Sequence, residues 1–211
     1  AEAQHDNMQS AAYRVIWGFL RKCPASKVRF CIFDPKEGGG SVRMLSNFVN
    51  KMPDSYKRAV TQMSRTEELL SCLKELEGQT LDFIRDRPDY DDLLDYNAHN
   101  LRRTEAITLL MLYDFPLNAD ARCLELLSSV MQKGNKCGIY VVLCRNTAVE
   151  VASSYDHVDE KLAELEKNCV QIECKENGFA LLPYHLSVRL IEKPDAGQLE
   201  KFAVEYHKAV E

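Results

Sequence analysis

Side chains able to bind a metal ion or a phosphate follow three apolar runs in this sequence. The three junctions are VRFCIF followed by Asp34-Pro35-Lys36, LLMLY followed by Asp114, and VVLC followed by Arg145-Asn146. An aspartate directly after an apolar strand is typical of sites that hold Mg²⁺ through water beside a nucleotide phosphate. Plainer interpretations stay open, because Asp114 could cap a following helix and Asn146 could form an Asx turn.

The elements that must position these residues follow from the spacing of apolar residues. Helices are predicted over residues 9–22, 62–86, 119–133, 155–167 and 199–206. Strands are predicted at 28–33, 106–113 and 139–144, with shorter ones at 169–174, 179–182 and 186–191. Asn177-Gly178, which joins two of the short strands, is a strong hairpin signal. Residues 38–60 are predicted to be irregular.

This order of elements predicts an α/β fold. We expect a mostly parallel sheet with helices on both faces and a hairpin at one edge. One domain is expected over residues 1–211. In such sheets ligands bind beyond the carboxyl ends of the strands, which makes the three junctions the candidate site.

Composition and charge narrow the classes of function. The formal net charge is −5 and the pI is about 5.6, so the chain has no general basic field that would draw it to nucleic acid or anionic lipid. The eight cysteines include no CxxC pair, which disfavours a metal cluster or a disulfide framework and favours a reducing, cytoplasmic location. No apolar run approaches the ~20 residues of a membrane span, and AEAQHDNMQS does not resemble a signal peptide.

The order of the elements and two sequence blocks resemble the motor domain of the FtsK/SpoIIIE/HerA family of ring-forming DNA translocases. The blocks are FLRKCPASKVRFCIFDPKEGG and LLMLYDFPLNADARCLELLSSVMQKGNKCGIYVVLCRN. The resemblance covers residues 5–210 and implies a RecA-like P-loop NTPase fold whose first strand is missing from this chain. It also implies ATP and Mg²⁺ as cofactors, with Asp114 as the Walker B-like metal ligand and Asn146 as a sensor-like residue.

The phosphate loop implied by this resemblance is degenerate. Counting back from Asp34-Pro35-Lys36 places the family's G-x-x-x-x-G-K-[ST] loop, called Walker A, on Glu2–Gln9. Met8 stands where the lysine belongs, and residues 1–12 contain neither glycine nor lysine. The cofactor-binding candidates that remain are Asp6, Asn7, Met8 and Gln9, and the Asp6 carboxylate would repel a phosphate. We therefore expect weak or no nucleotide hydrolysis.

The second block also departs from the family. The family commonly has a glutamate after the Walker B aspartate to activate water, but Phe115 occupies that position here. Glu37 and Glu125 are candidate substitutes. Arg145 falls at the threonine of the family's sensor pair, and it could be a finger acting on a neighbouring subunit or an ordinary solvated charge.

Two functions follow from these features. The first is an ATPase-fold domain of a nucleotide-dependent DNA or protein translocase, excised from a longer protein and acting in a homo-oligomeric ring or a heteromeric motor. The alternative is a non-catalytic interaction or scaffold module that kept the P-loop NTPase fold. A flavodoxin-like binder is a further, weaker reading, for which Gly38–Gly40 would have to be the phosphate loop.

Contact with DNA or with a ring pore is expected in the irregular segment 38–60. The three candidate basic residues are Arg43, Lys57 and Arg58, and they interleave with Phe48 and Tyr56. Grooves that track a nucleic-acid backbone use this mixture of cations and aromatic rings. A charged loop in solvent explains the segment equally well.

Overall fold

The computed structural model describes most of the chain and divides it into two compact units. The residues described are 2–23, 27–36, 60–102, 104–149, 158–175, 178–189, 195, 197–198, 201–202 and 205. The hairpin unit comprises Ala1–Ala25, Gly38–Val60 and Val170–Glu211, and the parallel-sheet unit comprises Ser26–Glu37 and Thr61–Cys169. The single domain expected over residues 1–211 stays a prediction.

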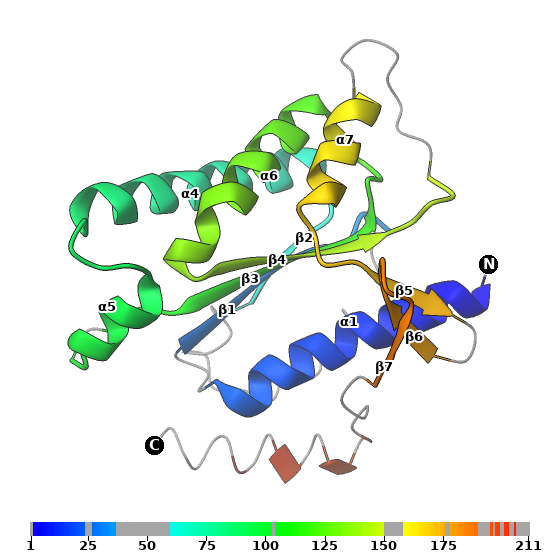
Figure 1. Ribbon diagram of the computed structural model, residues 1–211, viewed down its shortest axis with the longest axis horizontal. Coiled ribbons are helices and arrows are strands. Elements are labelled where there is room, and N and C mark those ends of the chain that lie inside the picture. Colours follow the sequence, from blue (N-terminus) through cyan, green and yellow to red (C-terminus); the bar gives the residue numbers. More distant parts are fainter. Residues whose placement is uncertain are drawn as a thin grey trace. The chain divides into compact units, whose positions relative to one another are not determined.

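A four-stranded sheet in the order β2-β1-β3-β4 is the centre of the parallel-sheet unit (Figure 1). Its strands are β1 (Val28–Phe33), β2 (Val60–Met63), β3 (Ile107–Phe115) and β4 (Ile139–Arg145). β1 and β4 both run parallel to β3, which is buried at every residue after Ile107. The carboxyl ends of β1, β3 and β4 therefore share one edge, and the expected α/β fold with a mostly parallel sheet is confirmed.

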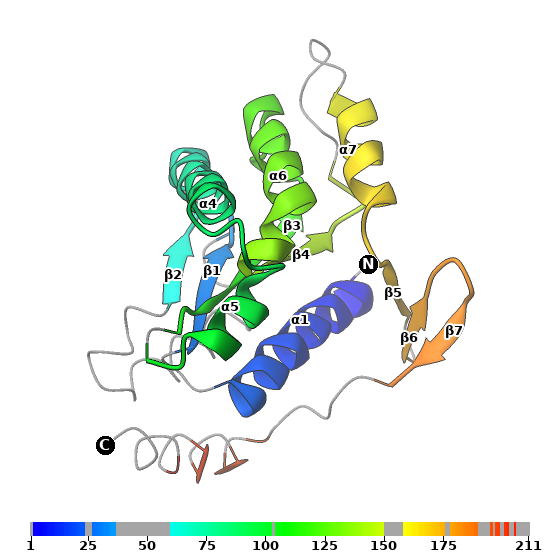
Figure 2. The ribbon, with the colours of Figure 1, turned by 60° about the vertical axis from the view of Figure 1, so that its left-hand side comes forward.

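Three helices of this unit lie side by side over one face of the sheet (Figures 1 and 2). They are α4 (Thr66–Asp86), α6 (Ala121–Lys133) and α7 (Val158–Lys167). In α4 the leucines 69, 73 and 76 recur at helical spacing and are buried, which places one side of the helix in the core. The same core cluster includes Leu110 of β3, Leu127 of α6 and Leu162 of α7, so all three helices share one apolar interior with the sheet.

The hairpin unit contains the first helix and a separate small sheet. Its elements are α1 (Glu2–Lys22), β5 (Ile172–Lys175), β6 (Gly178–Leu181) and β7 (Leu186–Val188). β6 pairs antiparallel with both β5 and β7, which confirms the predicted hairpin strands but places them in a three-stranded sheet of their own. Trp17 of α1 meets Phe202 edge to face, with 4.8 Å between the ring centroids.

The structure corrects several predicted boundaries. β2 lies where an irregular segment and the start of a helix were expected, because VTQM is too short and too polar to show a strand pattern. α1 begins at Glu2 rather than at residue 9, and α4 begins at Thr66 rather than at residue 62. α6 is followed by a 3-10 turn, η2 (Gly134–Cys137), and the left-handed glycine that leads into β4 is Gly138. Among the described residues, no helix is long and apolar enough to cross a membrane.

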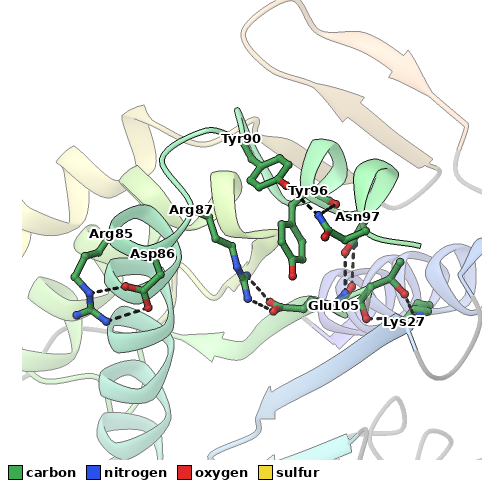
Figure 3. Close-up of polar contacts among 10 residues, drawn as sticks. Lys27, Arg85, Asp86, Arg87, Tyr90, Tyr96, Asn97 and Glu105 are labelled. Atoms are coloured by element: carbon green, nitrogen blue, oxygen red, sulfur yellow. Dashed lines mark hydrogen bonds and ion pairs between the residues drawn. The ribbon is translucent and has the colours of Figure 1, made fainter. Parts of the chain in front are cut away.

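The amino edge of the sheet is closed by a polar cluster around Arg87 and Glu105 (Figure 3). Arg87, directly after α4, donates from Nη1 to Glu105 Oε2 at 2.9 Å, and its guanidinium lies 4.2 Å from the ring centroid of Tyr96. Tyr96 and Asn97 belong to α5 (Leu93–His99). Asn97 exchanges two hydrogen bonds with the backbone of Glu105, at 3.0 and 2.7 Å. The cluster ties α4, α5 and the segment that enters β3.

The start of α4 is fixed by Glu68, and this contact gives a pH-dependent prediction. The backbone N–H groups of Ser64 and Arg65 donate to Glu68 Oε2 at 3.0 and 3.2 Å, and these bonds together with the Arg65 guanidinium lower the pKa of Glu68 from 4.5 to about 2. A lowered carboxyl pKa stabilises the folded state above the unfolded value and loses that effect as the pH falls through the folded value. Glu68→Gln is expected to lower the melting temperature at pH 7. The difference from the wild type should shrink as the pH falls from 4.5 towards 2.

Thermal unfolding followed by circular dichroism across this pH range tests the effect. Glu67→Gln is the matched control, because Glu67 is an exposed glutamate in the same helical turn. Equal losses for the two variants at pH 7 would mean that the bonds to Ser64 and Arg65 contribute nothing beyond a general charge effect at the helix start.

Candidate functional site at the carboxyl edge of the parallel sheet

Asp114 is the buried centre of the carboxyl edge. Asp114 is 3% exposed. It lies between Leu112 and Phe115, where a register shift interrupts the regular pairing of β3 with β4. Its φ angle of 49° is in the left-handed region, which aspartate and asparagine tolerate better than most residues. The bulge therefore presents a buried carboxylate at the end of the central strand.

The three strand ends singled out in the sequence come together around this carboxylate. Lys36 Nζ lies 3.0 Å from Asp114 Oδ2, and Asn146 Nδ2 donates to Asp114 Oδ1 at 2.8 Å. These residues follow β1 and β4, the two neighbours of β3. We call the set Asp34, Lys36, Asp114, Arg145 and Asn146 the strand-end cluster.

Asp34 shapes the turn that carries Lys36. The Asp34 residue is 6% exposed, and its Oδ1 accepts a hydrogen bond from the Lys36 backbone N–H at 3.1 Å. Its own backbone N–H donates to the Met63 carbonyl at the end of β2, at 2.8 Å. The turn is thus held by the Asp34 side chain and by the carbonyl of Met63 in the adjacent strand β2. Its Lys36 side chain points towards Asp114.

Asn146 and Arg145 tie the end of β4 to its surroundings. The Asn146 backbone N–H donates to the Phe115 carbonyl at 2.8 Å, and its Oδ1 accepts from the Ala148 N–H at 3.0 Å. Arg145 Nε donates to Glu166 Oε1 of α7 at 2.7 Å, and its Nη1 donates to the Asn146 carbonyl at 2.7 Å. Arg145 is therefore engaged with α7 and with the turn after β4, and its predicted role on a neighbouring subunit stays a prediction.

The contacts also decide between the plainer interpretations of the sequence. Asp114 does not cap a helix: the cap of α6 is Asp120, whose Oδ1 accepts from the Cys123 N–H at 2.8 Å. Asn146 does form the Asx turn, and it uses its amide nitrogen for Asp114 at the same time. Lys36 was expected at this edge as part of the Asp34-Pro35-Lys36 junction, but its pairing with Asp114 was not predicted. Its position just beyond the strand adjacent to β3 was the signal.

The other predicted site residues lie in the hairpin unit, in α6 or outside the described residues. Asp6, Asn7, Met8 and Gln9 lie in α1 of the hairpin unit, where Met8 is half-buried and the side chains of the other three are outside the described part. Arg43, Lys57 and Arg58 lie outside the described residues, as do Glu37 and Gly38–Gly40. Glu125 of α6 pairs with Lys161 of α7 at 2.6 Å. Their predicted roles stay predictions.

The fit of Mg²⁺ to this edge can be judged from Asp114. A magnesium ion would need an oxygen of this carboxylate, directly or through water. The Lys36 ammonium lies on one oxygen and the Asn146 amide on the other. In this arrangement the residues do not fit a divalent cation, because the ion would have to displace or lie beside a positive charge.

Comparison with solved structures identifies the fold. The cytoplasmic domain of the Thermomonospora curvata Type VII secretion ATPase EccC matches 94% of the chain at 13% identity, with a TM-score of 0.58. The cytoplasmic domain of EssC matches 93% at 14% identity, with a TM-score of 0.52. This is an FtsK/SpoIIIE-like ATPase fold.

The FtsK/SpoIIIE-like fold is shared with only part of each of those proteins. The chain spans 26% of the EccC structure and 41% of the EssC structure. A second T. curvata EccC structure, of ATPases 2 and 3 in complex with a signal sequence peptide, matches 96% of the chain at 14% identity with a TM-score of 0.50. No protein-family model matches the chain, and no curated protein matches it in sequence.

Proposed function

We propose that this chain is an ATPase-fold domain of a nucleotide-dependent translocase, weak or inactive in nucleotide hydrolysis. The observation that carries the proposal is the meeting of Asp114 and Asn146 at the carboxyl edge of an FtsK/SpoIIIE-like fold, while Met8 stands where the phosphate-binding lysine is expected. Methionine brings no charge to a β- or γ-phosphate. The backbone N–H groups at the start of α1 would be the remaining donors for a phosphate.

The cofactors and partners belong to the same proposal. ATP and Mg²⁺ would bind where a neighbouring domain or subunit completes the site with metal ligands that Asp114 does not provide, in a homo-oligomeric ring or a heteromeric motor in the cytoplasm. Protein is the favoured cargo, because the chain carries a net charge of −5 and one EccC structure holds a signal sequence peptide. DNA contact through Arg43, Lys57 and Arg58 is the proposed alternative route for cargo.

A second candidate function is a non-catalytic scaffold module with the same fold. The observation in its favour is that Lys36 and Asn146 already occupy both carboxylate oxygens of Asp114. A module of this kind would hold its neighbours in place without binding nucleotide.

Isothermal titration with ATP·Mg tests the first proposal and separates it from the second. The purified chain alone is expected to give no binding heat at micromolar nucleotide. When a neighbouring domain or subunit is added, a translocase domain should gain nucleotide affinity or ATPase activity, and a scaffold module should gain neither. Micromolar binding of ATP by the chain alone would contradict a degenerate nucleotide site.

A further inference from the structure

The Asp114 carboxylate is nearly closed off from solvent and needs a positive partner. Its side chain is 4% exposed, and ionised carboxylates at this depth are unfavourable unless they are paired and hydrogen-bonded. Asn146 supplies a neutral hydrogen bond to Oδ1, but an amide brings no net charge. Lys36 places a positive charge 3.0 Å from Oδ2.

Lys36 reaches Asp114 from a prepared turn. The Asp34 carboxylate accepts from the Lys36 backbone N–H, and the Asp34 N–H is held by the Met63 carbonyl of β2. The Lys36 side chain is 53% exposed while that of its partner is 4% exposed, so the lysine is the solvent-facing member of the pair. A cation approaching Asp114 from solvent would meet the ammonium first.

The ammonium and a divalent cation exclude one another at this carboxylate. Both need the negative charge of Asp114, and two like charges within a few ångströms repel strongly when little water separates them. The amide on Oδ1 leaves a metal ion no second oxygen of Asp114 that is clear of other donors.

We propose that Lys36 is a built-in counter-ion that takes the place of a divalent cation in the strand-end cluster. Lys36 neutralises Asp114 and closes the ends of β1, β3 and β4 without a metal. Removing its charge turns the Asp114 carboxylate into a site that accepts Mg²⁺ or Mn²⁺. This inference goes beyond the proposed function, because it concerns the contacts of one edge of the sheet whether the chain moves a cargo or serves as a scaffold.

Mn²⁺ titration followed by electron paramagnetic resonance tests the proposal without using nucleotide or activity. Lys36→Met removes the charge and nearly keeps the side-chain length. The variant is expected to bind Mn²⁺ at least about tenfold more tightly than the wild type, because the competing positive charge beside Asp114 is gone. The melting temperature of Lys36→Met should also rise with added Mg²⁺, while that of the wild type should not. Lys74→Met, at an exposed lysine of α4 in the same unit, is the control and should behave as the wild type does.

The remaining outcomes count against the proposal. Equal Mn²⁺ affinity for wild type and Lys36→Met would mean that the ammonium does not exclude the metal. Binding by neither protein would mean that Asp114 is not a metal site even without its counter-ion. If Lys36→Met does not fold, Lys36→Gln replaces it, because glutamine removes the charge and can still donate a hydrogen bond to Asp114. The same Mn²⁺ affinities are then expected for Lys36→Gln, and the same outcomes would contradict the proposal.

Discussion

Asp114→Ala is expected to lower the free energy of unfolding by about 2–4 kcal/mol. Alanine tolerates the left-handed φ of 49° poorly, at a cost of about 1 kcal/mol. The Asn146 amide loses its buried acceptor, which costs about 1–3 kcal/mol. The lost pair with Lys36 adds little, up to about 1 kcal/mol, because the lysine side chain is half exposed and solvent screens its charge.

Asp114→Asn separates these contributions. Asparagine accepts left-handed backbone angles, and its Oδ1 can still accept from Asn146, so the substitution keeps both of these features and removes the charge pair with Lys36. The expected loss is about 1 kcal/mol, measured for both variants by urea denaturation at equal salt. Equal losses for the alanine and asparagine variants would contradict the view that backbone conformation and the Asn146 bond dominate at this position.

Gly138→Ala is the second substitution with a large expected effect, again about 2–4 kcal/mol of lost stability. Gly138 has a φ of 70°, and a Cβ atom there would overlap Leu93 Cδ2 of α5. The backbone cannot shift freely, because the Gly138 N–H donates to Asn135 O at 3.1 Å and its carbonyl accepts from Thr108 N–H at 2.9 Å. The strain would therefore fall on the junction between η2, β3 and β4.

Gly78→Ala is the matched control for this prediction. Gly78 lies inside α4, and a Cβ atom there meets nothing within 4 Å. Alanine should raise helix stability by about 0.5–1 kcal/mol, so the two glycine variants should shift the urea midpoint in opposite directions. A loss of stability in Gly78→Ala would contradict the expectation that a Cβ atom fits at this position without a clash.

The sequence predicted the type and position of an element where that element is long and buries side chains at regular spacing. The leucine spacing of α4 and the continuous apolar run of β3 predicted their type and place, because helix and central strand each bury a repeating set of side chains. β2 and the separate hairpin sheet were not predictable in the same way. A four-residue strand such as VTQM has no period, and pairing between strands is set by tertiary contacts.

The candidate site was partly predictable for a related reason. Parallel strands have a common carboxyl edge, so Asp114 and Asn146 could be expected near one another from topology alone. The role of Lys36 depended on the direction of a turn, which the Asp34 side chain and the β2 carbonyl set together. Since β2 has no sequence pattern of its own, its contribution to that turn could not be predicted either.

The left-handed backbone at Asp114 limits which residues this position can hold. A bulge that holds φ at 49° admits few residue types, chiefly glycine, asparagine and aspartate, whatever chemistry occurs there. Among these, aspartate alone combines the backbone angle with an acceptor for an amide and a partner for a lysine. In a chain that no longer cleaves nucleotide, the pair with Lys36 would still favour an acid at this place. An acid here is therefore a sign of the lysine contact before it is a sign of catalysis.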